Sequence, residues 1–128
     1  GLSAQGDKAH DVIGLATGGP AFIYKNVVAD NGSIFKITVA CIEAPGQETA
    51  TITSDIDFAF NASAVLAYNG DASSSQLDMG TSVAGISKEL LAAPAADYMY
   101  ITEGGSAADT GLYNAGQYII TFYGQVLP

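Results

Sequence analysis

The sequence contains no arginine and no tryptophan, and only one cysteine and one histidine. Four lysines stand against 13 aspartates and glutamates, which gives a formal net charge of -9 over 128 residues. A nucleic-acid-binding face needs clustered lysine and arginine, so this composition excludes that class of protein. Without arginine, the chain also lacks the bidentate donor with which proteins hold phosphates and carboxylates.

The single cysteine and histidine restrict the chemistry further. One cysteine excludes an intrachain disulfide, a cysteine-based zinc site and a CxxC redox pair. One histidine excludes a His-rich metal centre and leaves little room for a catalytic triad. Cys41 continues the apolar face of a predicted strand, so we expect a buried structural thiol. The sequence therefore predicts no catalytic residue, no cofactor and no enzymatic activity.

Long apolar runs are also missing. No stretch approaches the ~18 consecutive apolar residues of a membrane-spanning helix. Charged residues make up 13% of the chain, about half of the ~25% that is usual in soluble domains. The length suits one domain with a real core. We therefore expect a single acidic domain whose surface is mostly Ser, Thr, Asn, Gln, Gly and Ala, with no nucleic-acid or membrane partner.

Aromatic and β-branched residues fill the chain in short alternating segments, which is typical of strands. Residues 21–29 and 33–42 flank Asn31-Gly32, and this dipeptide favours a tight turn, so the pattern predicts a β-hairpin over 21–42. On its second strand, strict alternation places four residues on one face: Phe35, Ile37, Val39 and Cys41.

Further strands and one helix are predicted along the rest of the chain. The strands are 11–16, 48–60 with a bend near Ser54-Asp55, 64–68, 76–79, 96–102 and 117–127. The helix is predicted at about 82–93, where Val83, Ile86, Leu90 and Leu91 recur at helical spacing before Pro94. About seven to nine strands with one short helix indicate an all-β fold, an antiparallel β-sandwich or jelly roll.

The domain organisation follows from these segments. Residues 1–9 are small and polar, and together with the first short strand they predict an extended N-terminal arm over residues 1–20. Residues 21–128 predict a single β-sandwich domain. We expect the arm to reach across a neighbouring subunit.

The last predicted strand, 117–127, is apolar on both faces, and residues 112–128 contain no charged side chain. A two-layer sandwich needs only one apolar face per strand, so the second face must meet the 82–93 helix, a loop or another subunit. Interfaces are enriched in tyrosine and depleted of charge. The interface candidates are Tyr98, Tyr100, Tyr118, Ile119, Tyr123 and Leu127.

Asp55 and Asp57 are two residues apart, so a strand places both carboxylates on one face. Paired carboxylates are calcium ligands or an acid/base pair. The alternative, which the acidic composition favours, is a solvated strand face. Calcium is therefore a minor candidate at these two residues, and no other metal site is predicted.

Two segments resemble those of small structural proteins of tailed bacteriophages. Gly111 to Gly124 (GLYNAGQYIITFYG) is similar to the strong aromatic and β-branched strand with which many of these proteins end. Gln76 to Ser82 (QLDMGTS) resembles their hydrophobic-x-hydrophobic-Gly-Thr segment. The layout over residues 20–127 resembles head decoration (cement) proteins and related virion β-sandwiches.

This resemblance implies a virion location, on the capsid surface. It implies a homo-oligomer, often a trimer at a symmetry axis, that contacts the major capsid protein and strengthens the shell by bridging capsomers. The family has no catalytic residues, so the resemblance transfers no site to this chain.

Two other functions remain open from the sequence. A carbohydrate-binding or adhesin β-sandwich module predicts exposed, coplanar tyrosines, although the absence of tryptophan argues against it. A subunit of an extracellular filament predicts that the N-terminal arm adds a strand to a neighbour's sheet; a major capsid protein belongs to the same group, although the chain is short for one. Both the adhesin and the filament subunit imply an extracellular location.

Overall fold

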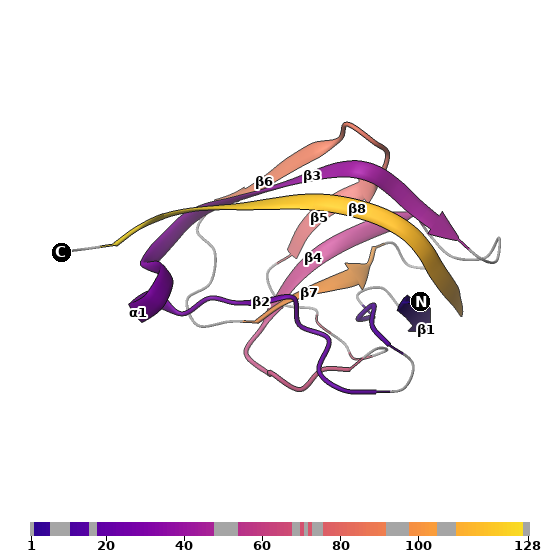
Figure 1. Ribbon diagram of the computed structural model, residues 1–128, viewed down its shortest axis with the longest axis horizontal. Helices are drawn as coiled ribbons and strands as arrows, with labels where there is room; N and C mark the ends of the chain where they lie inside the picture. The colour runs from indigo at the N-terminus through magenta and orange to yellow at the C-terminus, as the bar shows by residue number, and fades with distance from the viewer. Residues whose placement is uncertain are drawn as a thin grey trace.

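The computed structural model describes residues 2–5, 11–15, 18–47, 54–67, 70, 72, 76–91, 98–104 and 110–126. Two antiparallel sheets face each other, which confirms the β-sandwich (Figure 1). The first sheet has the order β1 (Leu2–Gln5), β8 (Thr110–Gln125), β3 (Ser33–Gln47), β6 (Ser87–Leu91). The second has the order β2 (Tyr24–Lys25), β7 (Tyr98–Glu103), β4 (Asp55–Asn61), β5 (Gln76–Thr81). No helix of the described residues is long and apolar enough to cross a membrane.

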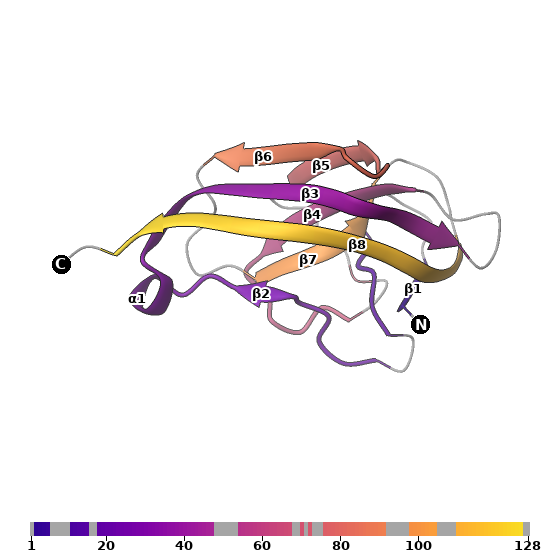
Figure 2. The ribbon, with the colours of Figure 1, turned by 45° about the horizontal axis from the view of Figure 1, so that its top comes forward.

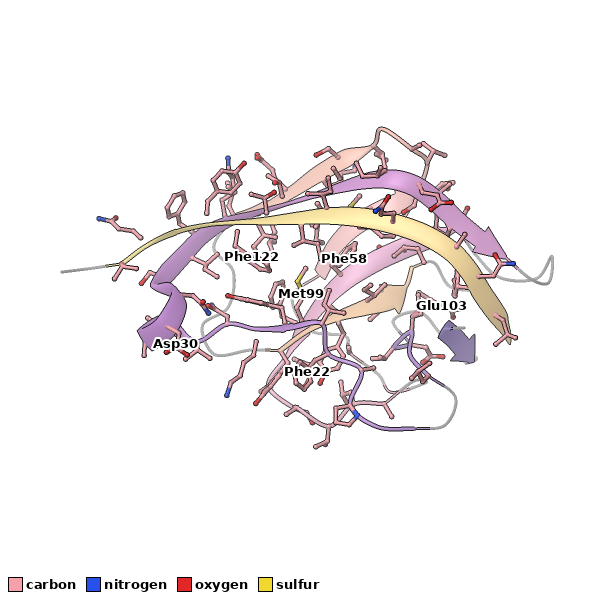
Figure 3. The ribbon with its side chains drawn as sticks, viewed as in Figure 1. Phe22, Asp30, Phe58, Met99, Glu103 and Phe122 are labelled. Carbon is pink, nitrogen blue, oxygen red and sulfur yellow. The ribbon has the colours of Figure 1, made fainter. Side chains whose placement is uncertain are left out.

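The main core lies between the two sheets. Inward side chains of β3 and β4 supply much of it, and the labelled Phe58, Met99 and Phe122 lie in this interior (Figure 3). The ring of Phe58 meets that of Tyr118 edge-on, with centroids 5.3 Å apart. Removal of this apolar surface from water, worth roughly 25 cal/mol per Å², is the main force that joins the sheets. The period of two in β4 is as predicted, with Ile56, Phe58 and Phe60 all buried.

The predicted hairpin over 21–42 is wrong. β2 pairs with β7 in the second sheet, whereas β3 pairs with β8 and β6 in the first. Between them lies the single-turn helix α1 (Val28–Asn31), which ends at Gly32 with a φ of 70°. Asn-Gly suits a positive φ at the end of a helix as well as in a hairpin turn. Asn31-Gly32 therefore does change the direction of the chain, but it does so where the chain passes from the second sheet to the first.

The predicted inward position of Phe35 is also wrong. The pairing of β3 with β8 shifts register between Ile34 and Lys36, which marks a β-bulge. Ile34 is therefore buried and Phe35 is 56% exposed. The alternation resumes after the bulge, and Ile37, Val39 and Cys41 all point inward as predicted.

The predicted helix over 82–93 is wrong over its described residues, 82–91, which form a turn and a strand, and residues 92–93 lie outside the described part of the chain. The turn includes Gly85, whose φ is 94°, and β6 then pairs with β3. Ile86 and Leu90 are partly buried against the core. Their spacing of four fits a helix, but it also places both side chains on one face of a strand. Hydrogen bonds to β3 decide between the two, because the amide of Gly85 donates to the carbonyl of Cys41.

Two described parts of the predicted N-terminal arm, residues 2–5 and 11–15, contact the sheets. β1 pairs with residues 110–113 of β8. Val12 is fully buried, and it bridges to Thr102 on β7. The amide of Ile13 donates to the carbonyl of Ile101 on the same strand. Residues 64–67, part of another predicted strand, are not in a strand in the structure.

Candidate functional site

The strand β8 borders the first sheet over most of its length. On one side it pairs with β3, from Ser33 opposite Gln125 to Gln47 opposite Tyr113. On its other side, the only described strand is β1, which covers residues 110–113 alone. Figure 2 shows β8 running along this border. Residues 114–125 therefore form an edge of the sheet within the described part of the chain.

The inward side chains of β8 are less well covered than those of β3. Three of them are only partly buried, although their register partners on β3 have no exposed surface. The difference follows from position, because β3 has a strand on each side, whereas no described strand pairs with the second side of β8 beyond residue 113. The three pairs are Tyr118 with Cys41, Ile120 with Val39, and Phe122 with Ile37.

Two of the predicted interface residues lie on the outward face of β8. The side chain of Ile119 is 55% exposed and that of Tyr123 is 40% exposed. The Nζ of Lys36, on β3, lies 4.2 Å from the centre of the Tyr123 ring, within the range of a cation–π contact. Leu91 is 65% exposed on β6, on the strand at the far edge of this sheet. The outward face is therefore apolar at both edges.

The remaining predicted interface residues are placed differently. Tyr98 is half-buried, with its ring edge-on to Phe22 and the Nζ of Lys25 5.1 Å from its centre. Tyr100 is fully buried, so it is not available to a partner in this structure. Tyr118 belongs to the partly covered inward row described above. Leu127 lies outside the described residues.

An apolar cleft opens between the two sheets beside the edge of β8. Its lining includes Ala115, Gly116 and Tyr118 from β8, together with Ile13 and Ile101. Ile13 and Ile101 also line a neighbouring hollow under residues 18–23. The partly covered row of β8 and this cleft thus belong to the same open side of the sandwich.

Cys41 is a buried structural thiol, as the sequence predicts. Its Sγ donates to the carbonyl of Glu43 at 3.3 Å, and its side chain has no exposed surface. Burial raises the pKa of Cys41, which favours the unreactive thiol over the nucleophilic thiolate. Burial also raises the pKa of its neighbour Tyr118 to about 12.

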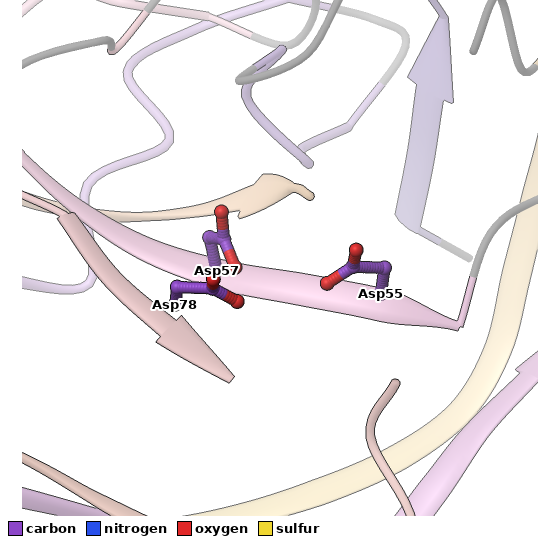
Figure 4. Close-up of side chains that lie close together, drawn as sticks. All are labelled: Asp55, Asp57 and Asp78. Carbon is purple, nitrogen blue, oxygen red and sulfur yellow. The ribbon is translucent and has the colours of Figure 1, made fainter. Parts of the chain in front are cut away.

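The two calcium candidates lie in a cluster of three carboxylates. Asp55 and Asp57 come from β4, and pairing with β5 brings Asp78 directly opposite Asp57 (Figure 4). One oxygen from each of the three lies within 4.8 Å of the others. Asp78 was missed from the sequence because it joins the cluster only through strand pairing.

Burial and mutual repulsion disfavour the charged form of this cluster. The pKa of Asp57 is raised to about 6, first by burial and then by the charges of Asp78 and Asp55. A hydrogen bond that the Met79 amide donates to Asp57 lowers this pKa in part. The pKa of Asp55 is raised by burial and then by Asp78. Calcium takes 6–8 oxygen ligands, and these three residues offer part of such a set.

Comparison with known proteins gives no relative for this chain: no family model, no curated protein and no solved structure matches it.

Proposed function

We propose that this chain is a virion structural protein, a head decoration (cement) protein that binds the capsid surface. It stabilises the shell through contacts with the major capsid protein and with copies of itself. The observation that supports this proposal is β8, a strand of 16 residues without a charged side chain, which exposes Ile119 and Tyr123 on its outward face. Depletion of charge together with exposed tyrosine is the composition of an interface core.

The charge distribution also supports a role in contact. The chain has a net charge of -9, yet none of its charged residues falls within 110–126. Acidic side chains are exposed elsewhere, as at Asp30 on α1, Asp78 on β5 and Glu89 on β6. A strongly acidic remainder keeps an assembled surface soluble, while the neutral strand approaches a partner without repulsion.

The positions of the tyrosines favour this function over a carbohydrate-binding module. Sugar stacking needs exposed, coplanar aromatic faces. Of the tyrosines in the described segments, only Tyr123 is exposed, and Lys36 lies over its ring. Tyr24 is stacked on Phe122 inside the sandwich, with centroids 4.1 Å apart.

Binding to particles tests the proposal. Purified chain is mixed with capsids of the phage that encodes it, prepared without this protein, and cosedimentation is measured. We expect saturable binding at a fixed ratio to capsomers. Tyr123→Ser is expected to weaken binding at least about tenfold, a loss of about 1.4 kcal/mol. Val83→Ser, also exposed but in the turn before β6, is the matched control and should bind normally. Absence of binding by the unaltered chain, or binding to glycans instead, would refute the proposal.

A further inference from the structure

The edge of β8 lacks the features that normally protect an edge strand. Proteins block open edges with charged side chains, prolines or short strands. Residues 114–125 contain no charged residue and no proline, and they form a long edge. The opposite edge strand of the same sheet, β6, has five residues and carries Lys88 and Glu89. The edge of β8 is therefore the one suited to accept another strand.

The sequence of this edge is nearly symmetric about Ile120. Residues of similar kind stand at equal distances on either side in three of the four pairs: Gly116 and Gly124, Tyr118 and Phe122, Ile119 and Thr121. Gln117 and Tyr123 form the one dissimilar pair. When two copies of one strand pair antiparallel about a two-fold axis, residues at equal distances from the axis lie opposite each other. Tyr118 therefore meets Phe122 and Ile119 meets Thr121, and aromatic and β-branched pairs of this kind stabilise a strand pair.

The same arrangement covers the exposed inward row. A two-fold axis perpendicular to the sheet keeps the inward face of both copies on the same side. The second strand then lies beside Tyr118, Ile120 and Phe122, which are the inward residues that β3 alone leaves partly exposed. The combined sheet has the order β6-β3-β8-β8-β3-β6 at its centre.

The charge distribution permits a second copy to approach at this edge. Each copy has a net charge of -9, so two copies repel over most of their surfaces. Residues 110–126 contain no charged side chain, so two β8 strands approach each other without repulsion between their own side chains.

We propose that two copies of this chain associate by antiparallel pairing of their β8 strands across residues 116–124, with Ile120 at the two-fold axis. The pairing rests on the proposed function for its biological role, since it names one of the contacts by which the protein assembles. This pairing produces a dimer. The subunit contacts of a trimer with three-fold symmetry do not include this pairing.

Charged substitutions on β8 test this pairing. Sedimentation equilibrium of the unaltered chain should give twice the 13.0 kDa mass of one copy. In Ile119→Lys/Thr121→Lys, the new side chains point outward in each copy but lie opposite each other in the dimer. Like charges directly opposite destabilise a strand pair, so the dissociation constant should rise at least about tenfold, or 1.4 kcal/mol.

The complementary variant makes the result specific. Ile119→Glu/Thr121→Glu should also be monomeric, and an equimolar mixture of the lysine and glutamate variants should restore the dimer. Restoration also shows that both variants are folded. Leu91→Lys, exposed on β6, is the matched control and should remain dimeric. A monomeric or trimeric unaltered chain, or a lysine variant that still dimerises fully, would overturn the pairing.

The two proposals can fail separately. A dimeric chain without affinity for capsids removes the proposed function and leaves the pairing intact. A monomeric chain that binds capsids removes the pairing and leaves the proposed function intact.

Discussion

Asp57 on β4 and Asp78 on β5 lie directly opposite each other in the second sheet. Asp57 is only 4% exposed, whereas Asp78 is exposed to solvent. Like charges directly opposite each other destabilise a strand pair, and burial adds to the cost of the Asp57 charge. The acidic cluster therefore weakens the fold at neutral pH.

Replacing Asp57 with asparagine should stabilise the protein at neutral pH. The pKa of Asp57 is about 6 in the folded chain, above its ordinary value of 3.8. The folded state thus favours the protonated carboxyl. The contribution of protonated Asp57 to the stability of the fold is fully present below pH 4 and is lost as the pH rises through 6. Urea unfolding should show Asp57→Asn to be more stable than the unaltered chain by about 3 kcal/mol at most at pH 7.5, with the difference vanishing near pH 4.

Asp30→Asn is the control for this change. It removes the same charge from an exposed position on α1, outside the cluster. We expect its stability to follow that of the unaltered chain at both pH values, within about 0.5 kcal/mol. A loss of stability in Asp57→Asn at pH 7.5 would show that the carboxylate is needed in its charged form.

A pair of phenylalanine substitutions tests the position of the core. Phe58 is fully buried between the sheets, so Phe58→Ala should lower the free energy of unfolding by about 3–5 kcal/mol. Phe35 lies on the bulge of β3 and is more than half exposed. Phe35→Ala should cost no more than about 0.5 kcal/mol. Equal losses in the two variants, measured by urea unfolding, would place Phe35 inside and remove the bulge.

Alanine substitutions at two glycines with positive φ distinguish the cost of backbone strain from the cost of a steric clash. A Cβ at Gly32, whose φ is 70°, would overlap the backbone carbonyl of Gln125, whereas a Cβ at Gly85, whose φ is 94°, would meet nothing within 4 Å. Gly85→Ala should therefore cost about 1–2 kcal/mol from conformation alone. Gly32→Ala should cost more, because the backbone of β8 must also move. Thermal unfolding that ranks the two in the opposite order would contradict this contact.

Local alternation was enough to predict much of the fold. Ile56, Phe58 and Phe60 identified β4, and segments 76–79, 96–102 and 117–127 correspond to β5, β7 and β8. The prediction from local sequence failed where the same spacing of apolar residues fits both a helix and a strand. The spacing of Ile86 and Leu90 fits a helix and a strand equally, and only the hydrogen bonds of this segment to β3 separate them.

The surfaces depend on strand order, which local sequence does not determine. Asp78 joins Asp55 and Asp57 only because β5 pairs with β4. Two apolar faces on residues 117–127 indicated a second contact. They did not indicate that, among the described strands, only β3 pairs with β8 beyond residue 113. The burial of Tyr100 likewise depends on residues distant in sequence, because Tyr100 packs in a second core cluster with Val12, Ala59 and Ala72.

The central claim is that β8 is the strand through which this protein makes contact. Amide hydrogen exchange over residues 116–124, measured at several protein concentrations, tests it most directly. Amides that face β3 should be protected at every concentration, while those that face the open edge should become protected as the concentration rises. Exchange at the open-edge amides that does not change with concentration, in a sample that associates, would contradict the claim.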